Sequence, residues 1–299
     1  MDVIFDLTPI FLTFLLGFFL KGLKAFDNKD GNRLLHLVFY LTGPLLTFRS
    51  LVDFKIDSSQ LVFLLSPFIF ITISFLIANS VKHTLGLNRK QKGVFVTSSM
   101  IFNTGFVLPF IISSFGDAGV ARFSIFNATN SILTFSWIYA VAVQHGRTNT
   151  NNNKGVLIKV LKAPSIWAVL LGLVFSYLGL SIPRIIMPLV QNIGDMTGPL
   201  IMIALGLIFN LKVFKLVPSI ASLLIRIGLG IIIGFIIVNF FNLHGIDRST
   251  LLLLAAAPIG FNTVTFASLE NLDEEYAASI VSIGLFVGLI LMPLLIFLI

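Results

Sequence analysis

The chain has 299 residues, of which 57% are hydrophobic and 11% are charged, and its formal net charge is +7. Soluble domains contain about 25% charged residues, so the composition excludes a soluble protein and indicates an integral membrane protein. Cysteine is absent, which excludes a disulfide framework, thiolate catalysis and zinc–thiolate sites.

Ten apolar segments are long enough to cross a bilayer as helices of about 20 residues. In chain order they cover residues 3–21, 34–52, 60–81, 91–115, 119–143, 164–182, 185–209, 216–242, 249–268 and 276–298. Several of them are interrupted by Gly, Pro or Asn. The sequence therefore predicts an all-α polytopic membrane protein with ten transmembrane helices.

The basic residues give these spans an orientation. If the N-terminus is outside, fourteen of the 20 Lys and Arg residues fall in inner connections, five in outer connections and one, Arg226, within a span. Cytoplasmic connections carry such an excess of positive charge. We expect a multi-pass protein of the cell (plasma) membrane with both termini extracytoplasmic. Because the charge follows the topology, the expected partner is the lipid bilayer and not a nucleic acid.

The two halves of the chain share short clusters at a constant separation. The "TGPL" of Thr42–Leu45 recurs 155 residues later at Thr197–Leu200, and "GF" of Gly105–Phe106 recurs at Gly260–Phe261. A biased composition is the alternative explanation, but matched Gly and Pro positions favour duplication. We predict a first five-helix repeat at residues 1–143, a polar linker at 144–160 and a second five-helix repeat at 161–299.

An odd number of spans inverts the second repeat in the membrane. Inverted repeats are typical of secondary transporters, whose substrate site lies near the bilayer midplane between the repeats.

Helix-breaking residues fall near the middle of two corresponding spans. Gly105 and Pro109 interrupt the fourth span, and Pro258 and Gly260 interrupt the ninth. In hydrocarbon, unwound backbone is tolerated only where protein or a water-filled cavity receives it. The N-terminal ends of the resulting half-helices would attract an anion such as a carboxylate. A proline kink that aids helix association is the alternative; in either case, Pro109 and Pro258 shape the breaks.

Neutral polar side chains at the breaks are the candidate substrate-binding residues. Asn103 is the first candidate, because an amide donates to a carboxylate without the cost of a buried charge. Thr104 and the amides around Gly105 would complete one half of the site, and Asn262 and Thr263 would form the opposite half. Helix capping or side-chain packing is the alternative role for these residues.

Two other spans carry polar candidates. Asn127, Thr129 and Asn130 lie within one turn of the fifth span, and Thr42 and Thr47 lie in the second. Polar side chains in a membrane helix usually face protein. Interhelical hydrogen bonding is the alternative to substrate contact.

Arg226 is the basic residue deep within a predicted span. A charge in the membrane is a functional hypothesis by default. Arg226 would either attract an anionic substrate or pair with Asp195 of the seventh span. A purely structural ion pair or a snorkelling side chain is the alternative.

Three stretches of the sequence resemble the auxin efflux carrier family, which includes plant auxin exporters and microbial malate and other organic-acid permeases. They are "FNTGFVLPF" at Phe102–Phe110, "GDMTGPLIMIALGLIF" at Gly194–Phe209 and "AAAPIGFNTVTFA" at Ala255–Ala267. The resemblance covers essentially the whole chain.

The resemblance implies a fold and a mechanism. It implies two inverted five-helix repeats, as in bile-acid sodium symporters, with the fourth and ninth spans crossing at their prolines. The site would lie between a support domain and a moving crossover domain, and the fifth span would line it. Homodimers are common in the family. The chain lacks the long hydrophilic loop of many plant members, which favours a compact microbial member and argues against auxin as the substrate.

We therefore expect a secondary transporter that exports small organic anions such as carboxylates by elevator-type alternating access. No cofactor, no metal and no enzyme activity are expected. A sodium- or proton-coupled symporter is the first alternative: the ninth span lacks the acidic residue that helps its symporter relatives hold sodium, while Asp195 leaves proton coupling open. A membrane-embedded enzyme is the second, although its magnesium site needs two acidic motifs and residues 273–275 form a single one.

Overall fold

The computed structural model describes residues 2–52, 60–146, 164–209 and 214–299, and this part of the chain is helical without a named strand. The helices of the first half are α1 (Asp2–Gly22), α2 (Asn28–Leu37), η1 (Val38–Thr42), α3 (Gly43–Val52), α4 (Gln60–Val81), α5 (Arg89–Met100), α6 (Thr104–Leu133), η2 (Thr134–Ile138) and α7 (Tyr139–His145). The helices of the second half are α9 (Pro164–Tyr177), α10 (Met187–Asp195), α11 (Thr197–Ile208), α12 (Leu216–Leu223), η3 (Leu224–Leu229), α13 (Gly230–Phe240), α14 (Gly245–Ala255), α15 (Asn262–Leu269) and α16 (Glu274–Leu298). The three η segments are single turns of π-helix.

Five continuous helical stretches are long and apolar enough to cross a membrane. They are Asn28–Val52, Gln60–Val81, Thr104–His145, Leu216–Phe240 and Glu274–Leu298. Shorter apolar helices occupy Leu7–Gly22 and Ile166–Tyr177. The expectation of an all-α polytopic membrane protein is confirmed at this level.

The fourth and ninth predicted spans are interrupted near the expected positions. Helix α5 ends at Met100, and α6 begins at Thr104. In the second half α14 ends at Ala255 and α15 begins at Asn262. The predicted seventh span is also divided, since α10 and α11 meet at Met196.

Helix α6 joins the second half of the predicted fourth span to the fifth span. Its path bends at Gly116, whose φ of 53° and ψ of −147° are not helical. Glycine adopts a positive φ without steric cost, so it permits this bend. The predicted linker at 144–160 lies outside the described residues from 147 onward.

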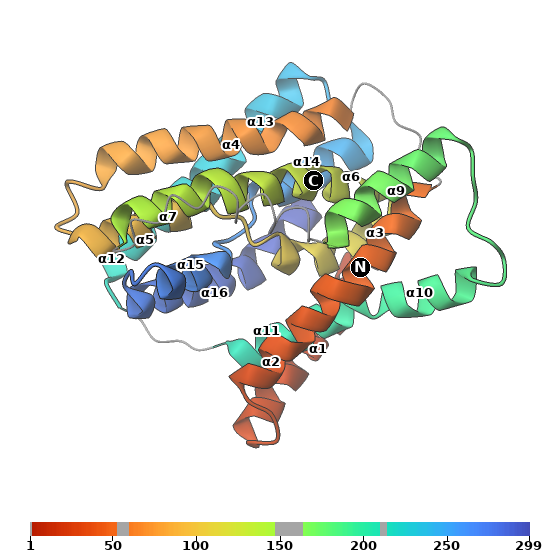
Figure 1. Cartoon of the computed structure of the whole chain (residues 1–299), viewed down its shortest axis with the longest axis horizontal. Coiled ribbons are helices and arrows are strands. Elements are labelled where there is room, and N and C mark those ends of the chain that lie inside the picture. Colours follow the sequence, from red (N-terminus) through yellow and green to blue (C-terminus); the bar gives the residue numbers. More distant parts are fainter. Residues whose placement is uncertain (1, 53–59, 147–163, 210–213) are drawn as a thin grey trace.

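The connections between helices lie on several sides of the molecule. In Figure 1 the turns at 82–88 and 270–273 lie at the left end, whereas the connection at 178–186 lies at the right end and the turn at 241–244 lies at the top. The turn at 82–88 thus lies at the end opposite to the connection at 178–186 (Figure 1).

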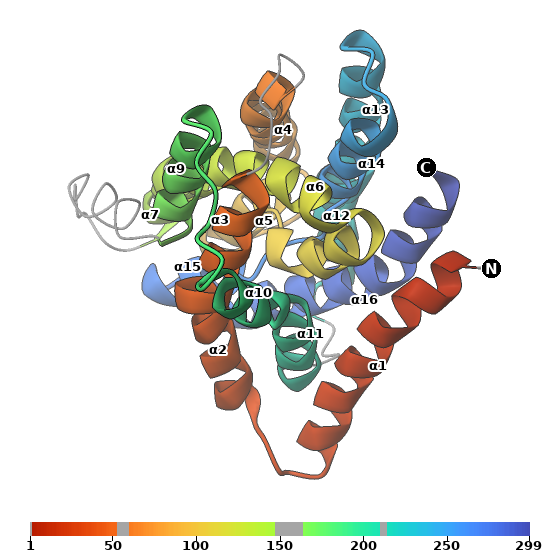
Figure 2. The same ribbon diagram turned by 90° about the vertical axis from the view of Figure 1, so that its right-hand side faces the viewer.

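The helices form two groups. The first group comprises α1, α2, η1, α3, α9, α10 and α11. In this group α1 and α2 pack on α11, α9 and α10 pack on α3, and η1 contacts both sets. The second group comprises α4 to α7 and α12 to α16, with η2 and η3. Figure 2 shows α1, α2, α10 and α11 below, and α4, α13 and α14 above. Helix α6 also contacts α1, α3 and α11, so it forms much of the boundary between the groups.

Glycines allow close approach within the first helix group. A Cβ on Gly17 of α1 would overlap the carbonyl oxygen of Ile203 in α11, and one on Gly206 would overlap the carbonyl oxygen of Phe14. In the α9–α3 pair, a Cβ on Gly172 would lie 2.7 Å from Leu51 Cβ. Small residues let membrane helices approach backbone to backbone, and here they fix the α1–α11 crossing.

Helix α2 begins after a capping residue. The Asp27 carboxylate accepts hydrogen bonds from the N–H groups of Asp30 (3.0 Å) and Lys29 (2.7 Å). The Asp30 N–H, foremost among several groups, holds the pKa of the Asp27 carboxyl below its ordinary value. The Asp30 carboxylate in turn accepts the Asp27 N–H, which completes a reciprocal capping arrangement.

Candidate functional site

The two helix breaks meet in the interior and pair through their backbones. Phe102 and Ile259 form an isolated antiparallel β-bridge. The Asn103 N–H donates to the Pro258 carbonyl at 2.8 Å, and the Gly260 N–H donates to the Ile101 carbonyl at 3.2 Å. Each break thus supplies partners for the other, which satisfies backbone groups that hydrocarbon could not.

Gly260 is required by this approach. A Cβ at this position would lie 2.6 Å from the Phe102 carbonyl oxygen. Real Cβ atoms do not come so close to backbone, so a larger residue would push the two breaks apart.

A pocket of about 300 Å³ lies beside the paired breaks. This volume suits a small organic molecule. None of the described residues that line it is charged. The polar lining consists of Thr47, Asn103, Thr104, Asn127, Asn130, Ser131, Thr134 and Asn262, together with the backbone of Gly105. Apolar lining residues include Phe102, Phe123, Phe135, Ile201 and Leu205.

Asn103 both caps a helix and lines the pocket. Its Oδ1 accepts the Phe106 N–H at 3.1 Å, which makes it the N-cap of α6, and its Nδ2 donates to the Ile259 carbonyl at 3.4 Å. The capping role that the sequence left open is therefore present. The residue is 5% exposed and borders the pocket.

The first turn of α6 presents backbone to the pocket. Thr104 and Gly105 are its first two residues, and the first N–H groups of a helix have no acceptor within it. Gly105 is exposed, and a Cβ there would meet only Asn103 Oδ1, at 3.9 Å. Pro109 has no N–H to donate to the Gly105 carbonyl four residues earlier. The pocket therefore borders backbone donors at the positive end of a helix.

The second part of α6 contributes a polar stripe. Asn127 accepts a hydrogen bond from Thr104 Oγ1 at 2.9 Å, which joins the predicted fourth and fifth spans at the pocket. The Asn130 Oδ1 and Thr134 Oγ1 atoms are buried and have no hydrogen-bond partner among the described residues. Unpaired buried acceptors and donors are costly, so these atoms are available to a bound molecule.

Ser131 and Thr134 also line the pocket, although they were not predicted from the sequence. Together with Asn127 and Asn130 they occupy positions i, i+3, i+4 and i+7, which share one face of a helix. This spacing was the signal that could have found them. Three π-helical turns also surround the region: η1 and η2 supply lining residues, and η3 holds Arg226. Such turns occur frequently at functional sites.

Some sequence candidates lie outside the pocket lining. Thr42, Thr129 and Thr263 are buried but do not border it. Their neighbours do, since Gly43, Asn130 and Asn262 are lining residues.

The two prolines occupy different positions relative to the breaks. Pro258 lies within the second break, where its carbonyl accepts the Asn103 N–H. Pro109 lies inside α6, after the first break rather than at it.

Arg226 is fully buried behind the breaks. Its Nη2 donates to the Ala255 carbonyl at 2.7 Å and its Nε donates to the Ala257 carbonyl at 3.2 Å. The guanidinium carbon lies 3.6 Å from the centroid of the Phe102 ring, a cation–π arrangement. Arg226 therefore satisfies carbonyls where α14 ends and also contacts the other break through Phe102.

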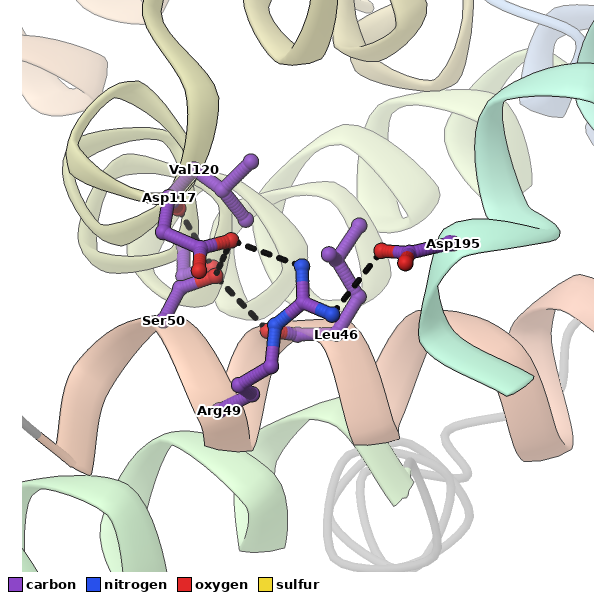
Figure 3. A network of polar contacts seen from close by, with 7 residues as sticks. Leu46, Arg49, Ser50, Asp117, Val120 and Asp195 are labelled. Atoms are coloured by element: carbon purple, nitrogen blue, oxygen red, sulfur yellow. Dashed lines mark hydrogen bonds and ion pairs between the residues drawn. The ribbon is translucent and has the colours of Figure 1, made fainter. Parts of the chain in front are cut away.

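Asp195 is not the partner of Arg226. Its carboxylate accepts a hydrogen bond from Arg49 Nη1 at 2.8 Å, as Figure 3 shows. Of the two roles considered for Arg226, the pairing with Asp195 was wrong, because Asp195 lies at the end of α10, beside α3, whereas Arg226 lies behind the breaks. In the described part of the chain Arg226 has no acidic partner.

Comparison with known proteins gives the family. The sequence pattern of a family described as membrane transport protein matches residues 2–296. The chain belongs to this family. A relative from Methanocaldococcus jannaschii, named an uncharacterized transporter, is 24% identical over 281 residues, which cover 90% of each chain. An uncharacterized transporter from Methanothermobacter thermautotrophicus is 25% identical over 293 residues, which cover 94% of this chain and 93% of the relative.

Membership confirms the resemblance to the auxin efflux carriers. The protein is a multi-pass membrane transport protein, in agreement with its apolar helices. The paired breaks and the pocket are therefore features of a membrane transport protein.

Proposed function

We propose that the protein is a secondary transporter that exports small organic anions, such as carboxylates, by elevator-type alternating access. The observation that carries this proposal is the pocket at the paired breaks. Amide and hydroxyl groups line it, and the N-terminus of α6 borders it. Neutral donors and a helix N-terminus suit a carboxylate that must be bound and then released.

In this proposal the substrate contacts come from both repeats. Asn103, Thr104, Gly105, Asn127 and Asn130 would contribute from the first, and Asn262 from the second. Thr42 and Thr263 would support the lining from behind. The fully buried charge of Arg226 would add positive potential on the far side of Phe102, which itself lines the pocket.

Two contacts support the proposed inverted repeats. Asn103 and Pro258, which share a hydrogen bond, differ by the same 155 residues that relate the sequence clusters. The close pair Gly17–Gly206 corresponds at that separation to the close pair Gly172–Leu51. Reciprocal contacts of this kind are expected when two copies of one unit associate about a two-fold axis. The N-terminal end of α1 and the C-terminal end of α16 also lie on one side of the molecule (Figure 2), as an even number of spans requires.

The membrane potential can drive export. An inside-negative potential favours the exit of an anion by about 2.3 kcal/mol per charge per 100 mV. At about 1.4 kcal/mol per tenfold, this sustains a gradient of roughly fifty-fold. Export therefore needs no coupled ion, whereas uptake by a symporter would.

Thermal unfolding of the purified protein against mono- and dicarboxylates, each with and without sodium, tests the proposal. A ligand that binds only the folded state raises the midpoint temperature; at a concentration one hundred times Kd it adds about 2.7 kcal/mol. We expect one class of carboxylate to raise the midpoint without sodium.

Other outcomes of this experiment point elsewhere. A shift that requires sodium would favour the symporter, and a shift that grows as the pH falls would favour proton coupling. If no carboxylate stabilises the protein, the anion proposal is wrong.

A further inference from the structure

An ion-pair network centred on Arg49 joins three segments that are distant in sequence (Figure 3). Arg49 Nη2 donates to Asp117 Oδ1 and Nη1 donates to Asp195 Oδ1, both at 2.8 Å. Ser50 Oγ donates to the Leu46 carbonyl at 2.8 Å and lies 3.4 Å from the same Asp117 oxygen. The Arg49 side chain is only 11% exposed, whereas those of Asp117 and Asp195 are 53% and 63% exposed. The planar guanidinium thus holds two carboxylates at once.

The two ion pairs of Arg49 join different helices. Arg49 lies in α3 and Asp195 ends α10, and both helices belong to the first helix group. Asp117 follows the bend at Gly116 in α6, which belongs to the second group. The Arg49–Asp117 pair therefore crosses the boundary between the groups, and the Arg49–Asp195 pair does not.

The network lies beyond one end of the pocket. The lining residues run from Thr47 back to Leu35 on one side and from Phe123 onward to Phe135 on the other, away from Arg49 and Asp117 in both cases. Leu35 precedes Arg49 by about 21 Å of helix at 1.5 Å per residue. In the proposed orientation, the network is on the extracytoplasmic side and the pocket extends toward the cytoplasm.

We infer that the Arg49–Asp117 ion pair is a latch that keeps the extracytoplasmic side closed while the pocket faces the cytoplasm. This inference rests on the proposed alternating access between the two helix groups. When the second group moves, Asp117 must leave Arg49, but Asp195 moves with α3 and keeps the guanidinium paired. A charge that retains one partner is not left unpaired, so the latch can open and close reversibly.

The absence of cysteine provides a direct test. Ser124 is 2% exposed and donates a hydrogen bond to Thr47 Oγ1 at 3.2 Å, between the network and the pocket. A Ser124→Cys variant therefore places a single thiol at the boundary of the groups. Its reaction with a membrane-impermeant maleimide added outside intact cells reports opening to that side. In the Ser124→Cys background we expect Asp117→Asn to raise the labelling rate roughly five-fold, because one partly exposed ion pair is lost. Arg49→Gln should change the labelling rate in the same direction.

Asp195→Asn is the matched control, because it removes a partner of Arg49 within one helix group. It should not raise the labelling rate, because the Arg49–Asp117 pair remains in place and opening would leave the guanidinium without a partner. The latch is wrong if neither Asp117→Asn nor Arg49→Gln changes the rate, or if Asp195→Asn raises it equally. If Arg49→Gln does not fold, Asp117→Asn carries the test, since its side chain is half-exposed.

The latch and the proposed substrate can fail separately. Carboxylate-induced stabilisation is measured on the same variants. A labelling response without any carboxylate shift would retain the latch and overturn the substrate class. A carboxylate shift without a labelling response would retain the substrate class and overturn the latch.

Discussion

At the residue scale, the paired breaks give single side chains two roles at once. Asn103 caps α6 through Oδ1 and also borders the pocket. Removing an N-cap side chain costs about 1 kcal/mol, so Asn103→Ala would lower stability as well as remove a donor. A substitution at Gly105 separates the effect on stability from the effect on binding, because a Cβ there would lie in open space in front of the backbone donors of α6.

Gly105→Ala should leave the fold intact and weaken carboxylate binding. The added methyl group meets no atom closer than 3.9 Å, yet it occupies the pocket beside the first N–H groups of α6. We expect an unchanged thermal midpoint without ligand and an affinity lower by about ten-fold, or about 1.4 kcal/mol, from the ligand dependence of the midpoint. Gly198→Ala is the control, since its Cβ makes an ordinary contact of 3.6 Å with Ile112 outside the pocket. Equal carboxylate affinities in the two variants would show that the α6 N-terminus is not part of the binding site.

At the element scale, the α1–α11 crossing depends on backbone contact. Gly17 and Gly206 face each other's helix without side chains between them. Lipid is as apolar as leucine, so helices in a membrane associate through close packing and not through the hydrophobic effect. These glycines therefore determine how near the two helices lie.

Gly206→Ala should destabilise the protein. Its methyl group would overlap the Phe14 carbonyl oxygen, which is backbone and cannot rotate away. Overpacking of this kind costs about 1–3 kcal/mol or more, and a lower midpoint of thermal unfolding in detergent would report it. Gly22→Ala at the end of α1 is the matched control, because no atom lies within 4 Å of its Cβ. If both variants unfold at the wild-type temperature, the helices are not in backbone contact.

At the scale of the whole molecule, the positions of the connections should match the distribution of charge. The turn at 82–88 carries Lys82 and precedes Arg89, Lys90 and Lys92, whereas the connection at 178–186 contains one basic residue, Arg184. These two connections lie at opposite ends of the molecule (Figure 1). Positive charge is retained on the cytoplasmic side of a membrane.

Single cysteines should report this orientation. Thr84 and Ser181 are both exposed, one in each connection. We expect an impermeant maleimide to label Ser181→Cys on intact cells and Thr84→Cys only after the cells are opened. The reverse pattern would place both termini in the cytoplasm.

Much of the candidate site could be predicted from the sequence. Gly105, Pro258 and Gly260 marked the breaks, because these residues interrupt a helix through their own covalent structure. Asn103, Thr104 and Asn262 were found for the same local reason. The membrane-protein class and the family followed from apolar runs and short motifs, which are also local properties of the chain.

Only the tertiary structure decided which polar residues share a pocket. Helix faces toward lipid and toward protein are both apolar, so the pattern that orients a helix in a soluble protein is weak here. Thr42 and Thr263 could therefore not be placed outside the lining from the sequence, although the helical spacing of Ser131 and Thr134 from Asn127 indicated a shared face. Likewise, the choice of Arg49 as the partner of Asp195, and of Phe102 and two carbonyls as the partners of Arg226, depended on how distant helices meet. The sequence alone determined where the helices break, whereas their association in space determined what each break contacts.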